Sequence, residues 1–256
     1  MINRNKQLLF GITLIALFNT ACGESKTSRS KDSGEKDNSR VQVEKTSEKE
    51  VPVIALKKDP LDYIPKGMVL FDKVSGDLNK DGIPDLVLMI KGTDKNNFVQ
   101  DEYRGELDRN RRGILVLFKH KDGYELVSKN ADCFSSENED GGVYYPPELS
   151  LDIRKGNLYV EYRHGRYGYW TYTFRYQNGE LELIGYDSTS AHGPVIEHIT
   201  SINFVTKRKQ DKVNTNELAE PEEEVYKETW KDIKQDKRMK LSEIKDFDEL
   251  YFPEYD

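Results

Sequence analysis

The sequence contains few of the residues on which disulfide-rich scaffolds and many enzymes depend. Two cysteines and four histidines occur among its 256 residues. No H-E-x-x-H or C-x-x-C spacing indicates a zinc site, and no G-x-S-x-G turn presents a serine nucleophile. These absences exclude a disulfide framework and leave the sequence without a familiar catalytic signature.

Long apolar runs and an excess of positive charge are also missing. The longest N-terminal apolar stretch, from Leu8 to Phe18, is too short for a spanning helix, which needs about 20 residues. The formal net charge is −7, and no basic stripe interleaved with aromatic residues is present. We therefore expect no nucleic acid among the partners, because such binding depends on positive charge.

The N-terminus has the organisation of a targeting segment. Arg4 and Lys6 precede the apolar stretch, and Asn19-Thr20-Ala21-Cys22 follows it. This tetrapeptide resembles a bacterial lipobox, although Asn19 occupies a position that is usually apolar. The resemblance implies that residues 1–21 are a signal peptide and that lipid attached to Cys22 anchors the chain to a membrane. The alternatives are an ordinary secretory signal with an incidental cysteine and an uncleaved anchor.

The residues after Cys22 predict how the chain leaves the membrane. Gly23 is not the aspartate that retains some lipoproteins at the inner membrane, which favours the outer membrane of the cell envelope. Residues 22–50 are rich in Ser, Lys and Glu and have too few apolar side chains to form a core. We expect a disordered tether here, with a root-mean-square span of about 30 Å. If Cys22 carries lipid, Cys133 has no disulfide partner and is expected to pack as a small hydrophobic residue.

The most informative motif is D-x-N-x-D-G-x-x-D, which runs from Asp77 to Asp85. Its oxygen-bearing side chains alternate along the loop, and calcium takes 6–8 oxygen ligands. Gly82 permits a sharp turn. An EF-hand would need a glutamate where Leu88 stands, so this is a different kind of calcium loop.

The motif resembles the calcium loops of FG-GAP (VCBS-type) repeats, in which such a loop joins two strands. The resemblance covers residues 76–88. It implies that a structural Ca²⁺ is held by the following ligands: the side chains of Asp77, Asn79, Asp81 and Asp85, and the carbonyl of Ile83. The alternative is a solvated turn in which Asn and Asp bond their own backbone.

The central part of the chain predicts strands joined by tight turns. Residues 85–91 and 114–118 are apolar runs typical of strands buried on both faces. Turn sequences separate residues 149–154 from 158–163, and 169–176 from 180–187, as in hairpins. Further strands are expected at 51–56, 69–71, 124–128, 200–206 and 225–230, with a short helical turn at 60–65. Residues 93–112, 187–194 and 207–224 are polar and are expected to be loops.

These elements predict a mostly β protein with a single antiparallel sandwich or a strongly curved sheet. The calcium motif occurs once and no fixed repeat is present, so a degenerate small β-propeller is the alternative. We assign residues 51–206 to a β-rich calcium-binding domain. Residues 207–256 are expected to be a charged extension partly packed on this domain, through Trp230, Met239, Leu241, Ile244, Phe247 and Leu250.

Aromatic residues are concentrated between residues 159 and 186. Because side chains alternate along a strand, Trp170, Tyr172, Phe174 and Tyr176 share one face and Tyr169 lies on the other. The first set is expected in the core. The remaining rings suggest a glycan-binding alternative with contacts from Tyr159, Tyr167 and Tyr169, which exposed rings beside Arg163 or Arg166 would support.

The functional prediction is a membrane-anchored exported lipoprotein whose calcium-stabilised domain binds a protein or glycan, or serves the structure of the envelope. A glycan-binding module is the first alternative. A hydrolase that uses Ser188 or Ser190 with His192 is the second, although the proximity of these residues in sequence does not establish a triad. Whether the protein is an enzyme is left open, with a non-enzymatic role favoured.

Overall fold

The computed structural model describes residues 55–140, 145–216, 218–234, 237–250 and 252. These residues form thirteen strands and four short 3₁₀ helices, and none of them lies in an α-helix. The predicted mostly β fold is confirmed as a sandwich of antiparallel sheets that does not close into a barrel. In this part of the chain, no helix has the length and apolar character needed to cross a membrane.

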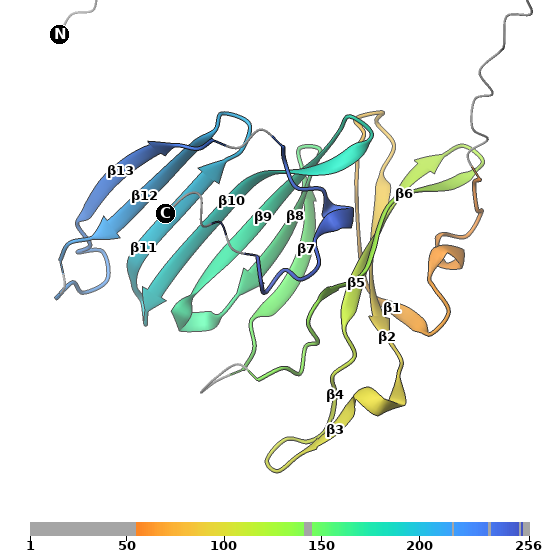
Figure 1. Cartoon of the computed structure of the whole chain (residues 1–256), viewed down its shortest axis with the longest axis horizontal. Coiled ribbons are helices and arrows are strands. Elements are labelled where there is room, and N and C mark those ends of the chain that lie inside the picture. Colours follow the sequence, from red (N-terminus) through yellow and green to blue (C-terminus); the bar gives the residue numbers. More distant parts are fainter. Residues whose placement is uncertain (1–54, 141–144, 217, 235–236, 251, 253–256) are drawn as a thin grey trace, which may run out of the picture. The chain divides into compact units, whose positions relative to one another are not determined.

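The smaller of the two main sheets has four strands in the order β1-β2-β5-β6 (Figure 1). They are β1 (Met68–Gly76), β2 (Asp85–Gly92), β5 (Arg112–His120) and β6 (Gly123–Phe134). The expected turn and strand near its start are present as η1 (Pro60–Tyr63) and β1. Residues 51–54, in which most of another strand was expected, lie outside the described residues.

The larger sheet is a seven-stranded meander, in which each strand pairs with its neighbour in sequence. Its strands are β7 (Glu148–Arg154), β8 (Asn157–Arg163), β9 (Gly168–Gln177), β10 (Glu180–His192), β11 (Val195–Asn203), β12 (Arg208–Asn214) and β13 (Tyr226–Asp232). The two predicted hairpins are confirmed as β7–β8 and β9–β10. Their turns contain Lys155, Gly156, Asn178 and Gly179 at positive φ.

The main core lies between the two sheets. Side chains from β2, β5 and β6 meet side chains from β7 to β11 in one buried cluster that includes Val116, Phe134, Val160 and Phe174. The predicted alternation on β9 is confirmed, because Tyr172 and Phe174 are buried whereas Tyr169 is 50% exposed. The described residues form two packed sheets and not the blades of a small β-propeller, which was the alternative prediction.

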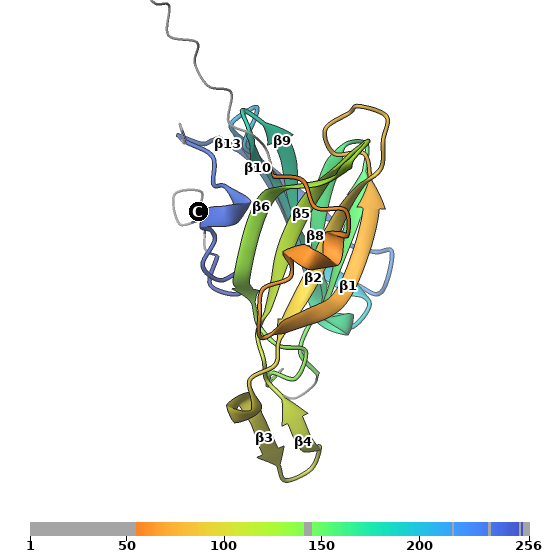
Figure 2. The ribbon, with the colours of Figure 1, turned by 90° about the vertical axis from the view of Figure 1, so that its right-hand side faces the viewer.

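Both faces of the small sheet are apolar. The inner face belongs to the main core, and the outer face is buried in a second hydrophobic cluster. Leu88, Ile90, Leu115 and Leu117 are fully buried there beneath Tyr63 at the end of η1. Figure 2 shows this turn lying against the strands. The double burial explains why β2 and β5 have continuous rather than alternating apolar sequences.

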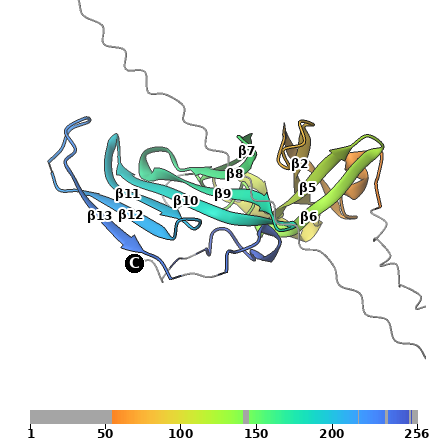
Figure 3. The ribbon, with the colours of Figure 1, turned by 90° about the horizontal axis from the view of Figure 1, so that it is seen from above.

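The C-terminal segment packs along the core face of the large sheet (Figure 3). Leu241 and Phe247 are buried, as predicted, and η4 (Leu241–Glu243) lies against β6 and β10. The Phe247 amide donates to the Cys133 carbonyl at 3.0 Å, and the Leu183 amide donates to the Met239 carbonyl at 2.8 Å. These bonds join the segment to one strand of each sheet.

Several polar segments differ from the expected loops. Residues 187–192 continue β10, residues 208–214 form β12, and residues 93–112 contain η2 (Lys95–Asn97) and the hairpin of β3 (Phe98–Asp101) with β4 (Gly105–Asp108). Backbone pairing with neighbouring strands stabilises these polar strands without requiring apolar side chains. Trp230 is also 50% exposed rather than packed on the core, with the Arg208 guanidinium over its ring.

Candidate binding site

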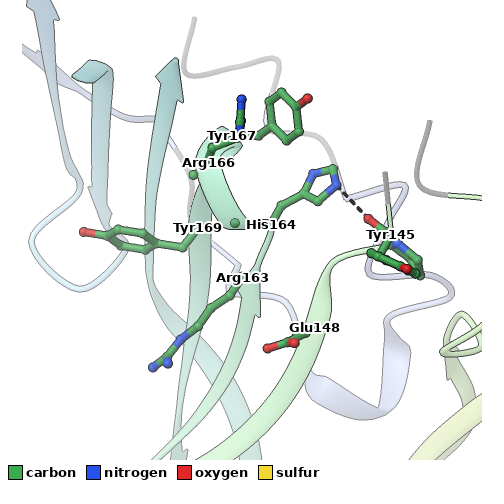
Figure 4. Close-up of a pocket in the computed structure, with 10 residues that line it drawn as sticks. Tyr145, Glu148, Arg163, His164, Arg166, Tyr167 and Tyr169 are labelled. Atoms are coloured by element: carbon green, nitrogen blue, oxygen red, sulfur yellow. Dashed lines mark hydrogen bonds between the residues drawn. The ribbon is translucent and has the colours of Figure 1, made fainter. Parts of the chain in front are cut away.

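A cavity of about 650 Å³ lies at the end of the large sheet, where β8 connects to β9. Ligand sites typically have volumes of about 300–1,000 Å³. The lining residues come from this connection and from the segment that enters β7 (Figure 4). They are Tyr145, Pro146, Glu148, Arg163, His164, Gly165, Arg166, Tyr167, Gly168 and Tyr169.

The β8–β9 connection is tight because two glycines allow it to turn. Gly168 has φ of +120°, and a methyl group in place of its hydrogen would collide with the backbone carbonyl of Thr189. Gly165 has φ of +52° at the start of η3 (Gly165–Tyr167). The His164 amide donates to the Gly168 carbonyl at 2.9 Å, which closes the loop. Arg166 and Tyr167, which line the cavity, belong to this turn.

A distant segment completes the wall opposite this turn. The ring Nε2 of His164 lies 3.0 Å from the backbone carbonyl of Tyr145. Since a carbonyl oxygen only accepts hydrogen bonds, Nε2 carries the hydrogen in this contact. The His164 ring also lies against the Tyr167 ring, with 5.1 Å between their centroids. His164 thus connects the two segments on which the cavity depends.

The three tyrosines of the cavity present their rings to solvent. Tyr145 is 78% exposed, Tyr167 41% and Tyr169 50%. The neighbouring core residues have the opposite arrangement, since Tyr162 and Trp170 stack in parallel on the inner face of the sheet at 5.1 Å. Exposed rings at a concave surface are suited to stacking against a bound ligand.

The charged side chains of the cavity are mostly basic. Arg163 and Arg166 line it together with one acid, Glu148. Arg163 projects into solvent with 70% of its side chain exposed, and its Nη2 lies 3.5 Å from Oε2 of Glu161. The cavity therefore combines ring faces with several hydrogen-bond donors.

A second cavity of about 460 Å³ opens between the sheets. Its aromatic residues are Tyr162, Trp170, Tyr172, Tyr186 and Phe247. These rings pack mainly against one another, as in the 5.0 Å edge contact of Tyr172 with Phe247. Burial raises the pKa of the Tyr162 hydroxyl far above its usual value. Tyr162, Tyr172 and Phe247 belong to the buried core, so this cavity is an opening of the core.

The predicted glycan contacts are only partly brought together. Tyr167 and Tyr169 both line the first cavity. Tyr159 does not, because it lies further along β8 and the Arg154 guanidinium covers its ring at 4.0 Å. Sequence reasoning missed Tyr145 and His164, which meet through a contact across 19 residues. No local pattern indicated that contact.

The predicted calcium loop joins β1 to β2 and is folded around its own side chains. The Asp77 carboxylate accepts from the amides of Lys80 at 2.6 Å and Gly82 at 3.0 Å. The Asp81 carboxylate accepts from the Ile83 amide at 2.7 Å. Lys80 and Gly82 have positive φ, which brings successive amides toward these oxygens.

Asp85 is the buried member of this loop. One carboxylate oxygen accepts from the Leu78 amide at 2.8 Å and weakly from Asn79 at 3.4 Å, and the other accepts from the Lys119 amide at 3.0 Å. Burial raises the pKa of Asp85, and these amide bonds oppose the rise. The side chain therefore closes the loop and joins it to β5.

The donor types of the loop suit calcium, but their positions do not form a coordination site. Three carboxylates, one amide oxygen and a backbone carbonyl are hard ligands of the kind calcium prefers. Asp77 Oδ2, Asp81 Oδ1 and Asp85 Oδ1 each accept one backbone amide and keep a second lone pair, whereas the other oxygens of Asp77 and Asp85 each accept two amides. However, no group of three or more Asp, Glu, His or Cys side chains in the described residues is placed to hold a metal ion.

The other predicted site residues are in different surroundings. Ser188 and Ser190 lie on β10 with His192, but Asp187 accepts from the Ser201 hydroxyl at 2.6 Å. Cys133 is a free cysteine in the core, where burial raises its pKa. Cys22 lies outside the described residues.

Comparisons with known proteins add no assignment: no family model matches the chain, and neither a curated protein nor a solved structure is significantly similar to it.

We predict that Asp85→Ala destabilises the domain even when EDTA removes all divalent ions. The substitution leaves the buried amide of Leu78 and the partly buried amide of Lys119 without their acceptor, which should lower the free energy of unfolding by about 3 kcal/mol. Asp81→Ala is the matched control, because its carboxylate is exposed and should contribute about 1 kcal/mol or less. Urea unfolding in EDTA measures both values. Equal losses would contradict the structural role of Asp85.

Proposed function

We propose that this chain is an exported, lipid-anchored protein that binds carbohydrate in the cavity between the β8–β9 connection and the start of β7. The observation that carries the proposal is the exposure of Tyr167 and Tyr169 beside Arg163 at a concave surface. A sugar has an apolar C–H face that stacks on a tyrosine ring and hydroxyls that bond to charged side chains. The cavity offers both kinds of contact within one site.

A binding role is favoured over catalysis by the surroundings of the candidate catalytic groups. Asp187, which a local triad would need, instead accepts a hydrogen bond from the Ser201 hydroxyl. The cavity itself brings together arginines, a histidine, a glutamate and tyrosines. Only one of these is a carboxylate, whereas most glycoside hydrolases need a pair. We therefore propose recognition without turnover.

The carbohydrate proposal predicts that Tyr169→Ala weakens glycan binding by about tenfold, since an aromatic stacking contact contributes about 0.5–1.5 kcal/mol beyond burial. A glycan array with the full chain would identify ligands, and calorimetry would measure the loss. Tyr103→Ala is the control, because Tyr103 is 89% exposed on the hairpin tip between β3 and β4 and lies outside the cavity. Unchanged binding by the Tyr169 variant would rule out this site.

A second proposal is that the Asp77–Asp85 loop binds Ca²⁺ and stabilises the β1–β2 connection. Its support is the D-x-N-x-D-G-x-x-D pattern and the oxygen-rich donor set. Bound calcium would be held by Asp77, Asn79, Asp81, Asp85 and the carbonyl of Ile83. The ion would supply positive charge that offsets repulsion among the three carboxylates.

Calcium binding predicts a higher melting temperature in Ca²⁺ than in EDTA or Mg²⁺. A site with a Kd of about 10⁻⁴ M gains about 1.4 kcal/mol at ten times that concentration, which corresponds to about 3–6 °C. Asp81→Asn should reduce the shift while retaining a side-chain oxygen that can accept the Ile83 amide. A shift that persists in this variant would assign the effect to another site.

Anchoring through Cys22 is the third part of the proposal, and its support is the lipobox-like sequence. In cells, Cys22→Ala should abolish the incorporation of labelled fatty acid and move the protein out of the membrane fraction. Cys133→Ala is the control, since that thiol is buried in the core. Labelling that is lost in the Cys133 variant but retained in the Cys22 variant would contradict the assignment.

A further inference from the structure

The cavity has a local charge opposite to that of the chain. The chain has a formal net charge of −7, yet the cavity is lined by two arginines, Arg163 and Arg166, and one acid, Glu148. Charges separated by more than about 8 Å are largely screened at physiological ionic strength. A ligand in the cavity therefore experiences the nearby arginines more strongly than the acidic surface of the rest of the chain.

Arg163 is the side chain best placed to bind an anion. Its nearest acidic neighbour is Glu161, at 3.5 Å, which is also paired with Arg154. The Glu161 side chain is 13% exposed whereas that of Arg163 is 70% exposed. The Arg163 guanidinium thus keeps donors directed to solvent, and a guanidinium can bind a carboxylate through two parallel hydrogen bonds.

The pairing of strands places this guanidinium beside a stacking surface. Arg163 on β8 lies directly opposite Tyr169 on β9, so both side chains are on the outer face of the sheet. Directly opposite side chains have Cβ atoms about 4.5–5.5 Å apart. Figure 4 shows both side chains extending to the same side of the sheet. A sugar ring stacked on Tyr169 would bring a substituent within reach of Arg163.

Glu148 favours one orientation of a bound ligand. It pairs with Arg163 from the other side, on β7, so the order across three strands is Glu148, Arg163, Tyr169. A carboxylate near Glu148 would be repelled, whereas a sugar hydroxyl there would donate to it. The arrangement favours one orientation, with the acidic substituent between the ring of Tyr169 and the guanidinium.

From this placement we propose that the cavity selects acidic sugars, of the class that carries a carboxylate on the ring as uronic acids do. The inference rests on the proposed carbohydrate site and adds the class of sugar. The Tyr169 ring would contact the C–H face, and Arg163 would bind the carboxylate with additional attraction from Arg166. Neutral sugars would keep the stacking contact and lose the charged one.

Calorimetry on the full chain in mild detergent and 150 mM salt tests this inference. The probes are a trimer of α-1,4-linked galacturonic acid and the carboxyl-reduced trimer of the same linkage, which is neutral. We expect the acidic trimer to bind at least about tenfold more tightly, as one charge-assisted contact permits. Arg163→Gln should bring the ratio below about threefold and change the neutral affinity less than twofold.

The matched control is Arg208→Gln. Arg208 lies on β12 of the same sheet, its side chain is 51% exposed, and it does not line the cavity. Its substitution removes the same charge from the chain and should leave both affinities unchanged. An equal loss of preference in this variant would attribute the effect to general electrostatics and overturn the role of Arg163.

Three further outcomes overturn the inference in different ways. Equal or tighter binding of the neutral trimer would reject the acidic preference and leave the carbohydrate site intact. Displacement of the acidic trimer by equimolar acetate would indicate a simple anion site without a sugar contact. Failure of both trimers to bind, together with an empty glycan array, would reject the carbohydrate proposal itself.

Discussion

The alternation of side chains along β8 and β9 is the constraint on which both the core and the candidate site depend. Tyr162 and Trp170 face the small sheet and stack on each other, so their neighbours Arg163 and Tyr169 must face outward. A slip of one residue would bury the arginine and expose the stacked rings. The packing of buried Tyr162 and half-buried Trp170 on the inner face therefore fixes the position of the groups proposed to bind a ligand.

The unequal size of the two sheets determines which surfaces remain available. The four-stranded sheet is covered on both faces, by the large sheet on one side and by η1 and its neighbours on the other. The seven-stranded sheet extends beyond its partner, and the C-terminal segment covers part of its inner face through Phe247 and Leu241. The cavity lies at one end of this sheet, at the β8–β9 connection and the start of β7.

Local sequence predicted the hairpins well because their determinants are local. Turn residues such as Gly156 and Gly179, flanked by alternating aromatic and polar residues, were sufficient for β7 to β10. The extension of β10 to His192 and the strand β12 were not predicted, since their stability comes from pairing with neighbours rather than from apolar side chains. Tyr167 and Tyr169 were identified from the local aromatic pattern. Tyr145 was not, because it reaches them only through its contact with His164, a residue distant in sequence.

In the Asp77–Asp85 loop, the Asp85 side chain has a structural role that does not depend on an ion. Asp85 already accepts three backbone amides and is buried, so it holds the loop against β5 whether or not an ion is present. Ion binding would then act mainly on Asp77 and Asp81, whose carboxylates are more accessible and are bonded to amides within the loop. A structural ion in this loop would adjust a connection that is already formed. Its contribution to stability should therefore be smaller than that of the Asp85 carboxylate.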